Sequence, residues 1–147
     1  MLLRSDPQLE IELVDDTFAD LTISQPLDWT GVENDRGRLL VRVWGEDGGF
    51  RGADDFLDLY HTAAFSRGER EFVATARLPR SELNEDIGRG AIRRARRRRD
   101  KDEIYVKVQA EVEGLVCRWD RFGGGCRTRF IQFQNERKSN VVGGLRF

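Results

Sequence analysis

The sequence IYVKVQAEV at residues 104–112 has the clearest secondary-structure pattern in this chain. Apolar side chains occupy every second position of the stretch: Ile104, Val106, Val108, Ala110 and Val112. The positions between them hold Tyr105, Lys107, Gln109 and Glu111. A period of two is typical of a β-strand with one face in a hydrophobic core and the other in water. We therefore predict a strand here whose five apolar side chains enter the core.

Similar short segments occur on both sides of this strand. We expect strands at residues 9–14, 21–23, 39–44, 56–60, 72–78, 116–119, 126–133 and 141–147. Turn-forming residues separate them, and one helical turn, capped by Ser81, is expected after Pro79. This pattern predicts an all-β fold, an antiparallel two-sheet β-sandwich of seven to nine strands with a short basic loop or helix insertion.

The length and composition indicate one soluble domain. A chain of 147 residues, 39% hydrophobic and 35% charged, fits a single domain spanning residues 1–147. No apolar run approaches the roughly 18 residues of a membrane-spanning helix. The first residues do not show the pattern of a secretory signal, which favours the cytoplasm.

A basic segment directly precedes the strand at residues 104–112. Residues 88–101, GRGAIRRARRRRDK, hold eight cations and one acid, a net charge of +7, which leaves −8 for the rest of the chain. Six arginines are concentrated in it: Arg93, Arg94, Arg96, Arg97, Arg98 and Arg99. Such density requires free solvent, a polyanion or an acidic protein surface around it. We interpret these arginines as a site for an acidic protein partner, and nucleic acid is the alternative.

Two cysteines, Cys117 and Cys126, flank a glycine-rich turn. A disulfide across the neck of a hairpin would require the turn to centre near Arg121 and Phe122, whereas the glycines centre it nearer Gly124. The sequence therefore leaves the disulfide open. A bridge would place the protein in an oxidising compartment outside the cytoplasm, and free thiols would leave the cytoplasm open.

An acidic, glycine-rich connection joins two of the predicted strands. The sequence WGEDGGFRGADDFLDLY at residues 44–60 resembles the third calcium loop of calcium-dependent phospholipid-binding domains of the C-two type, which are β-sandwiches. The resemblance implies calcium as a cofactor, with Asp47, Asp54 and Asp55 as ligands. Gly45 stands where that family would place its first aspartate.

Catalytic patterns are weak in this sequence. His61 is the single histidine, and Asp58 would lie on the opposite face of the same strand. Neither a nucleophile elbow nor a zinc pattern is present. Trp44 is expected in the core. Trp29 and Trp119 border loops, and packing in the core or against loops is the favoured expectation for them. The alternative is that they are exposed and stack on sugars or fill a partner's pocket.

These observations favour a non-enzymatic binding or structural module, a subunit of a larger assembly. Its expected partner is another protein or a second copy of the chain. Nucleic acid is the second candidate, and a calcium-dependent surface-binding domain is the third. Membrane contact is expected only through calcium.

Overall fold

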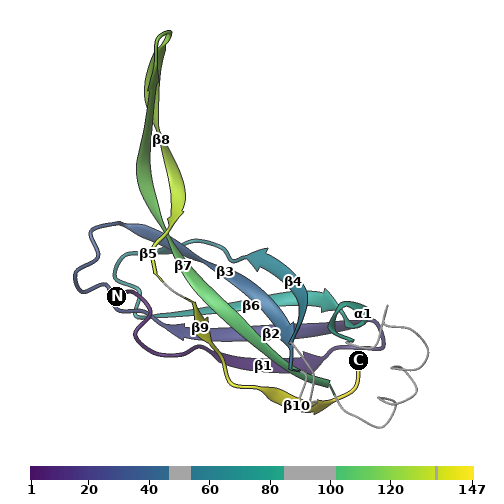
Figure 1. The fold of residues 1–147 in the computed structure, drawn as a ribbon. Helices are drawn as coiled ribbons and strands as arrows, with labels where there is room; N and C mark the ends of the chain where they lie inside the picture. The colour runs from purple at the N-terminus through teal and green to yellow at the C-terminus, as the bar shows by residue number, and fades with distance from the viewer. Residues whose placement is uncertain (47–53, 85–101, 135) are drawn as a thin grey trace.

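Two antiparallel sheets packed face to face form the protein (Figure 1). The computed structural model describes residues 1–46, 54–84, 102–134 and 136–147. Within these ranges there are ten strands and one four-residue helix, which confirms the predicted all-β sandwich. This count exceeds the predicted seven to nine because it includes two strands of only two residues each, which were not predicted. They are β5 (Phe65–Ser66) and β9 (Arg137–Lys138).

The smaller sheet has the strand order β1-β2-β6. Its strands are β1 (Gln8–Leu13), β2 (Phe18–Pro26) and β6 (Glu71–Pro79). Leu9 lies opposite Ile23 and both are buried, whereas Glu10 lies opposite Thr22 on the outer face. The alternation of these strands therefore sends most apolar side chains into the core and most polar ones to solvent, and the buried Gln25 and the exposed Val73 are exceptions.

The larger sheet has the order β10-β7-β3-β4, with β5 on β3 and both β8 and β9 on β7. Its longer strands are β3 (Arg36–Gly45), β4 (Asp55–His61), β7 (Asp102–Asp120), β8 (Gly123–Gln132) and β10 (Val142–Leu145). Strand β3 pairs with β7 from Gly37 opposite Val112 to Gly45 opposite Ile104. The predicted strand at residues 104–112 is thus the half of β7 that lies within the sandwich.

The five apolar side chains predicted to enter the core do so. Ile104, Val106, Val108 and Ala110 are fully buried, and Val112 is 1% exposed. Tyr105 is also buried although it lies on the outer face of β7. The ammonium group of Lys138 lies 4.1 Å from the centre of its ring. A covering side chain, rather than the sheet's inner face, removes this tyrosine from water.

Two local predictions were wrong. Helix α1 (Arg80–Leu83) has Pro79 at its N-cap position and makes no side-chain cap hydrogen bond, so Ser81 lies inside the helix instead of capping it. Trp44 is half-buried outside the core, against Phe56, with ring centroids 5.5 Å apart. The reason is its position in β3, since the buried apolar residues of that strand occupy the odd positions.

Candidate functional site

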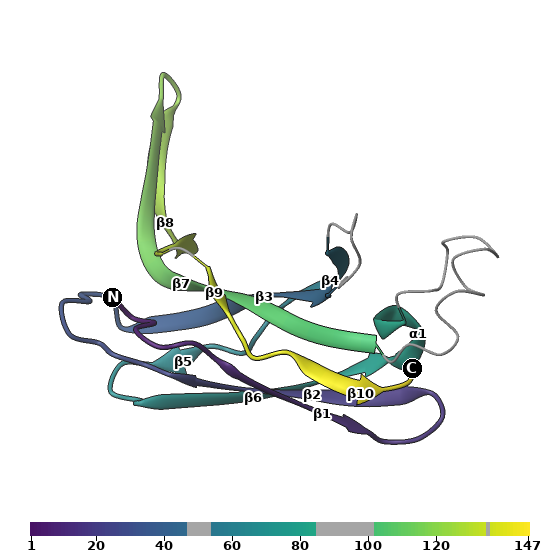
Figure 2. The ribbon, with the colours of Figure 1, turned by 60° about the horizontal axis from the view of Figure 1, so that its bottom comes forward.

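A long hairpin projects from the sandwich. Strand β7 pairs with β8 through ten residue pairs, from Glu111 opposite Gln132 to Asp120 opposite Gly123. Beyond Val112, β7 no longer pairs with β3 and continues with β8 alone. Figure 1 and Figure 2 both show this hairpin standing away from the two sheets. We call residues 115–129 the hairpin arm.

Side chains of the larger sheet hold the base of the arm. Arg38 Nε donates a hydrogen bond of 2.7 Å to Glu111, and the Arg38 guanidinium lies 4.4 Å from the centre of the Phe130 ring. Arg36 forms a 3.2 Å ion pair with Glu113, whose carbonyl oxygen accepts a hydrogen bond from Asn34. These contacts join β3 and its preceding loop to both strands at the foot of the arm.

A disulfide bond links the two strands of the arm. Cys117 lies directly opposite Cys126, and their sulfur atoms are bonded. The turn is centred on Arg121 and Phe122, which is the arrangement that direct pairing of the cysteines requires. Gly123, with a φ of 112°, follows the turn as the first residue of β8. The question that the sequence left open is thus resolved as a disulfide.

One face of the arm is apolar and exposed to solvent. Leu115, Cys117 and Trp119 of β7 share this face with Cys126 of β8, because side chains alternate along each strand. Leu115 is 70% exposed and Trp119 is 74% exposed. Phe122, in the turn, is 86% exposed. Large apolar side chains displayed together on a projecting element are typical of interaction sites.

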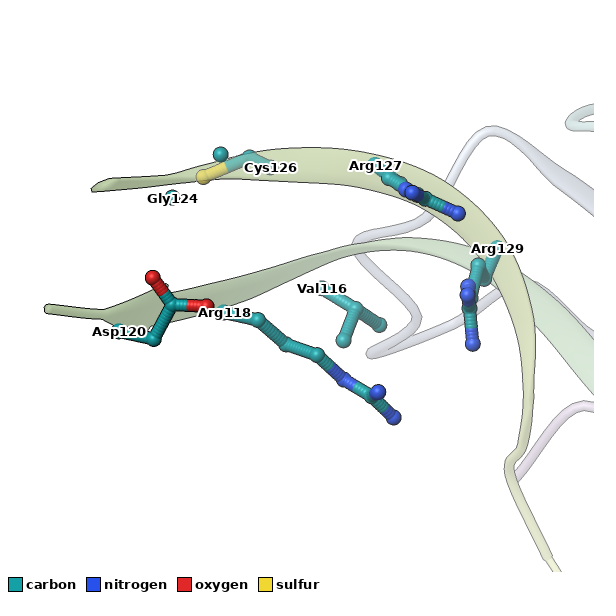
Figure 3. Close-up of a pocket in the computed structure, with 8 residues that line it drawn as sticks. Val116, Arg118, Asp120, Gly124, Cys126, Arg127 and Arg129 are labelled. Atoms are coloured by element: carbon teal, nitrogen blue, oxygen red, sulfur yellow. The ribbon is translucent and has the colours of Figure 1, made fainter. Parts of the chain in front are cut away.

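The opposite face carries arginines. Figure 3 shows Arg118, Arg127 and Arg129 on the two strands of the arm, near Val116, and these residues line a groove. This groove has a volume of about 450 Å³. Its lining is Val116, Arg118, Asp120, Gly124, Gly125, Cys126, Arg127 and Arg129. We call the side of the arm that bears Arg118, Arg127 and Arg129 the arginine face.

The charge of the arm is not balanced locally. The arm holds four arginines and one aspartate, a net charge of +3. Among the described residues, Arg118, Arg127 and Arg129 form no ion pair, and Arg121 in the turn packs over the Phe122 ring at 4.9 Å. Three guanidinium groups on one concave face form a surface that fits carboxylate or phosphate groups.

The predicted sites in the two long connections lie wholly or partly outside the described residues. The six arginines of the basic segment (Arg93, Arg94, Arg96, Arg97, Arg98 and Arg99) and Asp47 belong to the ranges that the structure does not describe. Their roles stay predictions.

Asp54 and Asp55, the other predicted calcium ligands, are both half-buried. The Tyr105 hydroxyl donates a hydrogen bond of 2.5 Å to Asp54 Oδ2. Burial and then this hydrogen bond raise the pKa of the Tyr105 phenol, which keeps it protonated as a donor. Within the described ranges, no group of three or more His, Cys, Asp and Glu side chains is arranged to hold a metal ion. Calcium binding stays a prediction.

His61 has a partner that its sequence position did not suggest. Its Nε2 lies 3.4 Å from Glu111 Oε1, the same oxygen that accepts the hydrogen bond from Arg38. Asp58, the residue considered with His61 from the sequence, is not this partner. The contact belongs to the base of the hairpin arm.

The tryptophans show what the sequence missed. Trp29 packs against the core, edge-on to Phe65 at 5.9 Å, as expected. Trp119, in contrast, stands on the arm, and the expectation that it would pack in the core or against loops was wrong. The alternation of the predicted segment 116–119 indicated a strand, but alternation cannot show whether any layer covers that strand.

Comparison with known proteins adds distant similarities only. No family model and no curated protein match the chain. It is similar to β-glucosidase 3B from Thermotoga neapolitana in complex with glucose, at 11% identity and a TM-score of 0.37, over 90% of this chain and 16% of that one. It is also similar to a β-glucosidase from Kluyveromyces marxianus in complex with glucose, at 12% identity and a TM-score of 0.32, over 97% of this chain and 15% of that one.

The chain spans about a sixth of the length of these enzymes. Resemblance this distant bears on neither its activity nor its ligands. In the part of the chain that the structure describes, no helix is long and apolar enough to cross a membrane.

Proposed function

We propose that the protein is a non-enzymatic β-sandwich interaction module, a subunit of a larger assembly, that binds an acidic protein surface through its arginines. The observation that carries this proposal is the hairpin arm, which places a basic face and an apolar face outside the sandwich. The arginine-rich segment at residues 93–99 is proposed to contribute to the same partner.

The chemistry of the arm supports a protein partner. Tryptophan and arginine are enriched among the residues that dominate protein interfaces, where the aromatic ring fills a pocket and the guanidinium pairs with a carboxylate. Trp119 and Arg118 present both kinds of side chain from adjacent positions on opposite faces. The disulfide supports a rigid arm and an oxidising compartment. A rigid arm loses little conformational entropy on binding.

Nucleic acid is the second candidate, favoured by the same arm. An element that bears arginines on one face, and an exposed tryptophan and phenylalanine on its other face and in its turn, also suits phosphates and unstacked bases. Leu115 and the disulfide, however, add apolar surface that a phosphate backbone does not use, and this favours protein.

The experiment that tests the proposal is fluorescence anisotropy with two labelled probes of equal charge. One probe is a glutamate-rich peptide with an aromatic residue, and the other is an oligonucleotide, single- or double-stranded. The proteins are the wild type, a variant with residues 88–101 replaced by a Gly/Ser linker, and the arm variant Arg127→Gln/Arg129→Gln. Arg70→Gln/Arg146→Gln is the matched control, because both arginines are exposed and lie outside the arm.

We expect the wild type and the control to bind the peptide, and the arm variant to bind it at least about tenfold more weakly. Tighter binding of the oligonucleotide, with a steep loss between about 50 and 200 mM salt, would move nucleic acid to first place. Binding of the peptide that is equal in all variants, or absent in all, would overturn the proposal.

A further inference from the structure

The smaller sheet carries an acidic outer face. Four acids and one arginine, a net charge of −3, lie on this side of the sheet: Glu10, Glu12, Asp20, Glu71 and Arg77. Arg77 is paired with Asp20 at 2.8 Å. Among the described residues, Glu10 and Glu12 form no ion pair and their side chains are exposed. We call this surface the glutamate face.

The arm and the glutamate face have the same spacing of opposite charges. Arg127 and Arg129 are two residues apart on β8, so their side chains share one face. Glu10 and Glu12 are two residues apart on β1 and also share one face. In each strand, the two charged residues are about 6.8 Å apart along the strand axis. Two arginines of the arm can therefore meet two glutamates in one register.

The two surfaces do not meet within one molecule. Figures 1 and 2 show the arm projecting away from the smaller sheet, and no ion pair of the described residues joins them. Like charge disfavours pairing between two arms, because each carries +3. Complementary charge instead favours contact between the arm of one molecule and the glutamate face of another.

We infer that the protein assembles with a second copy of itself, head to tail, with the arginine face of the arm of one copy on the glutamate face of the next. In this arrangement Arg127 and Arg129 pair with Glu10 and Glu12. Val73, which is 57% exposed on the outer side of β6, offers an apolar contact on the glutamate face. Such a contact uses two different surfaces, so it continues into a ring or a filament. The inference rests on the proposed function and names its partner.

Sedimentation velocity over a wide range of concentration tests the inference. The variants are Arg127→Glu/Arg129→Glu, Glu10→Arg/Glu12→Arg, and all four substitutions in one chain. The wild type is expected to associate more at high concentration and less at high salt. Each double variant alone is expected to stay monomeric, because its arm and its sheet face then carry the same charge. An equimolar mixture of the two, and the fourfold variant alone, are expected to associate.

The restored association is the decisive result, since a variant that merely fails to fold cannot show it. A wild type that stays monomeric at every concentration would overturn the inference. So would association that both double variants retain, or that neither the mixture nor the fourfold variant restores. If the arm binds the acidic peptide while the protein stays monomeric, the proposed function stands and only the second copy is excluded as partner.

Discussion

Cys117 lies directly opposite Cys126 in the hairpin arm, and the disulfide between them joins the only two strands that the arm contains in the described part of the chain. An isolated two-stranded hairpin is marginally stable in water. The disulfide therefore stabilises the arm, as packing of the core stabilises the sandwich.

Reduction of this disulfide should loosen the arm and leave the sandwich intact. A disulfide that closes a loop of about ten residues contributes roughly 2.5–3 kcal/mol of stability. Its loss corresponds to about a hundredfold increase in the rate of amide exchange. Hydrogen exchange measured by mass spectrometry should show faster exchange in residues 115–129 after reduction or in Cys117→Ser/Cys126→Ser. Amides of β2 should keep their protection, and equal acceleration there would contradict an independent arm.

Two neighbouring glycines in the arm should respond differently to alanine. A Cβ on Gly124 would lie 2.2 Å from the Arg118 carbonyl oxygen and 2.7 Å from Trp119 Cα, whereas one on Gly125 would meet nothing within 4 Å. Gly124→Ala should therefore displace the strands of the arm and cost about 1–3 kcal/mol of its local stability. Amide chemical shifts in the arm should move strongly in this variant and little in Gly125→Ala. Equal shifts in both would contradict the packing described for Gly124.

Phe65 should matter to stability and Phe122 should not. Phe65 is 2% exposed and packs between Trp29 and Phe72, with its ring 4.9 Å from that of Phe72. Phe65→Ala should lower the free energy of unfolding by about 3–5 kcal/mol in urea titrations. Phe122→Ala removes an exposed ring and should change it by less than about 0.5 kcal/mol. A large loss from Phe122→Ala would mean that its ring is packed rather than displayed.

The contact between Glu82 and Asp58 should make stability depend on pH. A hydrogen bond to Asp58, followed by burial and charge repulsion, raises the pKa of Glu82. The stability that the protonated Glu82 contributes is present at low pH and is lost as the pH rises through its raised pKa. Glu82→Gln should therefore be more stable than the wild type near pH 7, by less than about 1 kcal/mol because Glu82 is exposed to solvent.

This advantage should shrink towards about pH 4, where the wild-type carboxyl group is itself protonated. Thermal melts at both pH values measure it. Glu33→Gln is the control, since it removes the same charge from an exposed position. A stability gain that is identical in the control would attribute the effect to net charge instead of to Asp58.

The sandwich itself could be predicted from local sequence. The alternation at residues 104–112 identified all five side chains that enter the core from this strand, because a period of two with one apolar face suits only a half-buried strand. The other longer strands of the sandwich were predicted near their observed positions, whereas the two-residue strands β5 and β9 were not predicted. Burial of Tyr105 escaped prediction, since Lys138 and Asp54, which cover it, come from distant parts of the chain.

The hairpin arm depended on tertiary structure. The sequence by itself determined that residues 116–119 and 126–133 would pair, and that Cys117 and Cys126 would flank their turn. It did not determine that β3 stops pairing with β7 at Val112, or that no second layer covers Leu115 and Trp119 in the described structure. An alternating pattern shows which face of a strand is apolar, whereas the neighbouring elements decide whether that face is buried in the core or exposed to solvent.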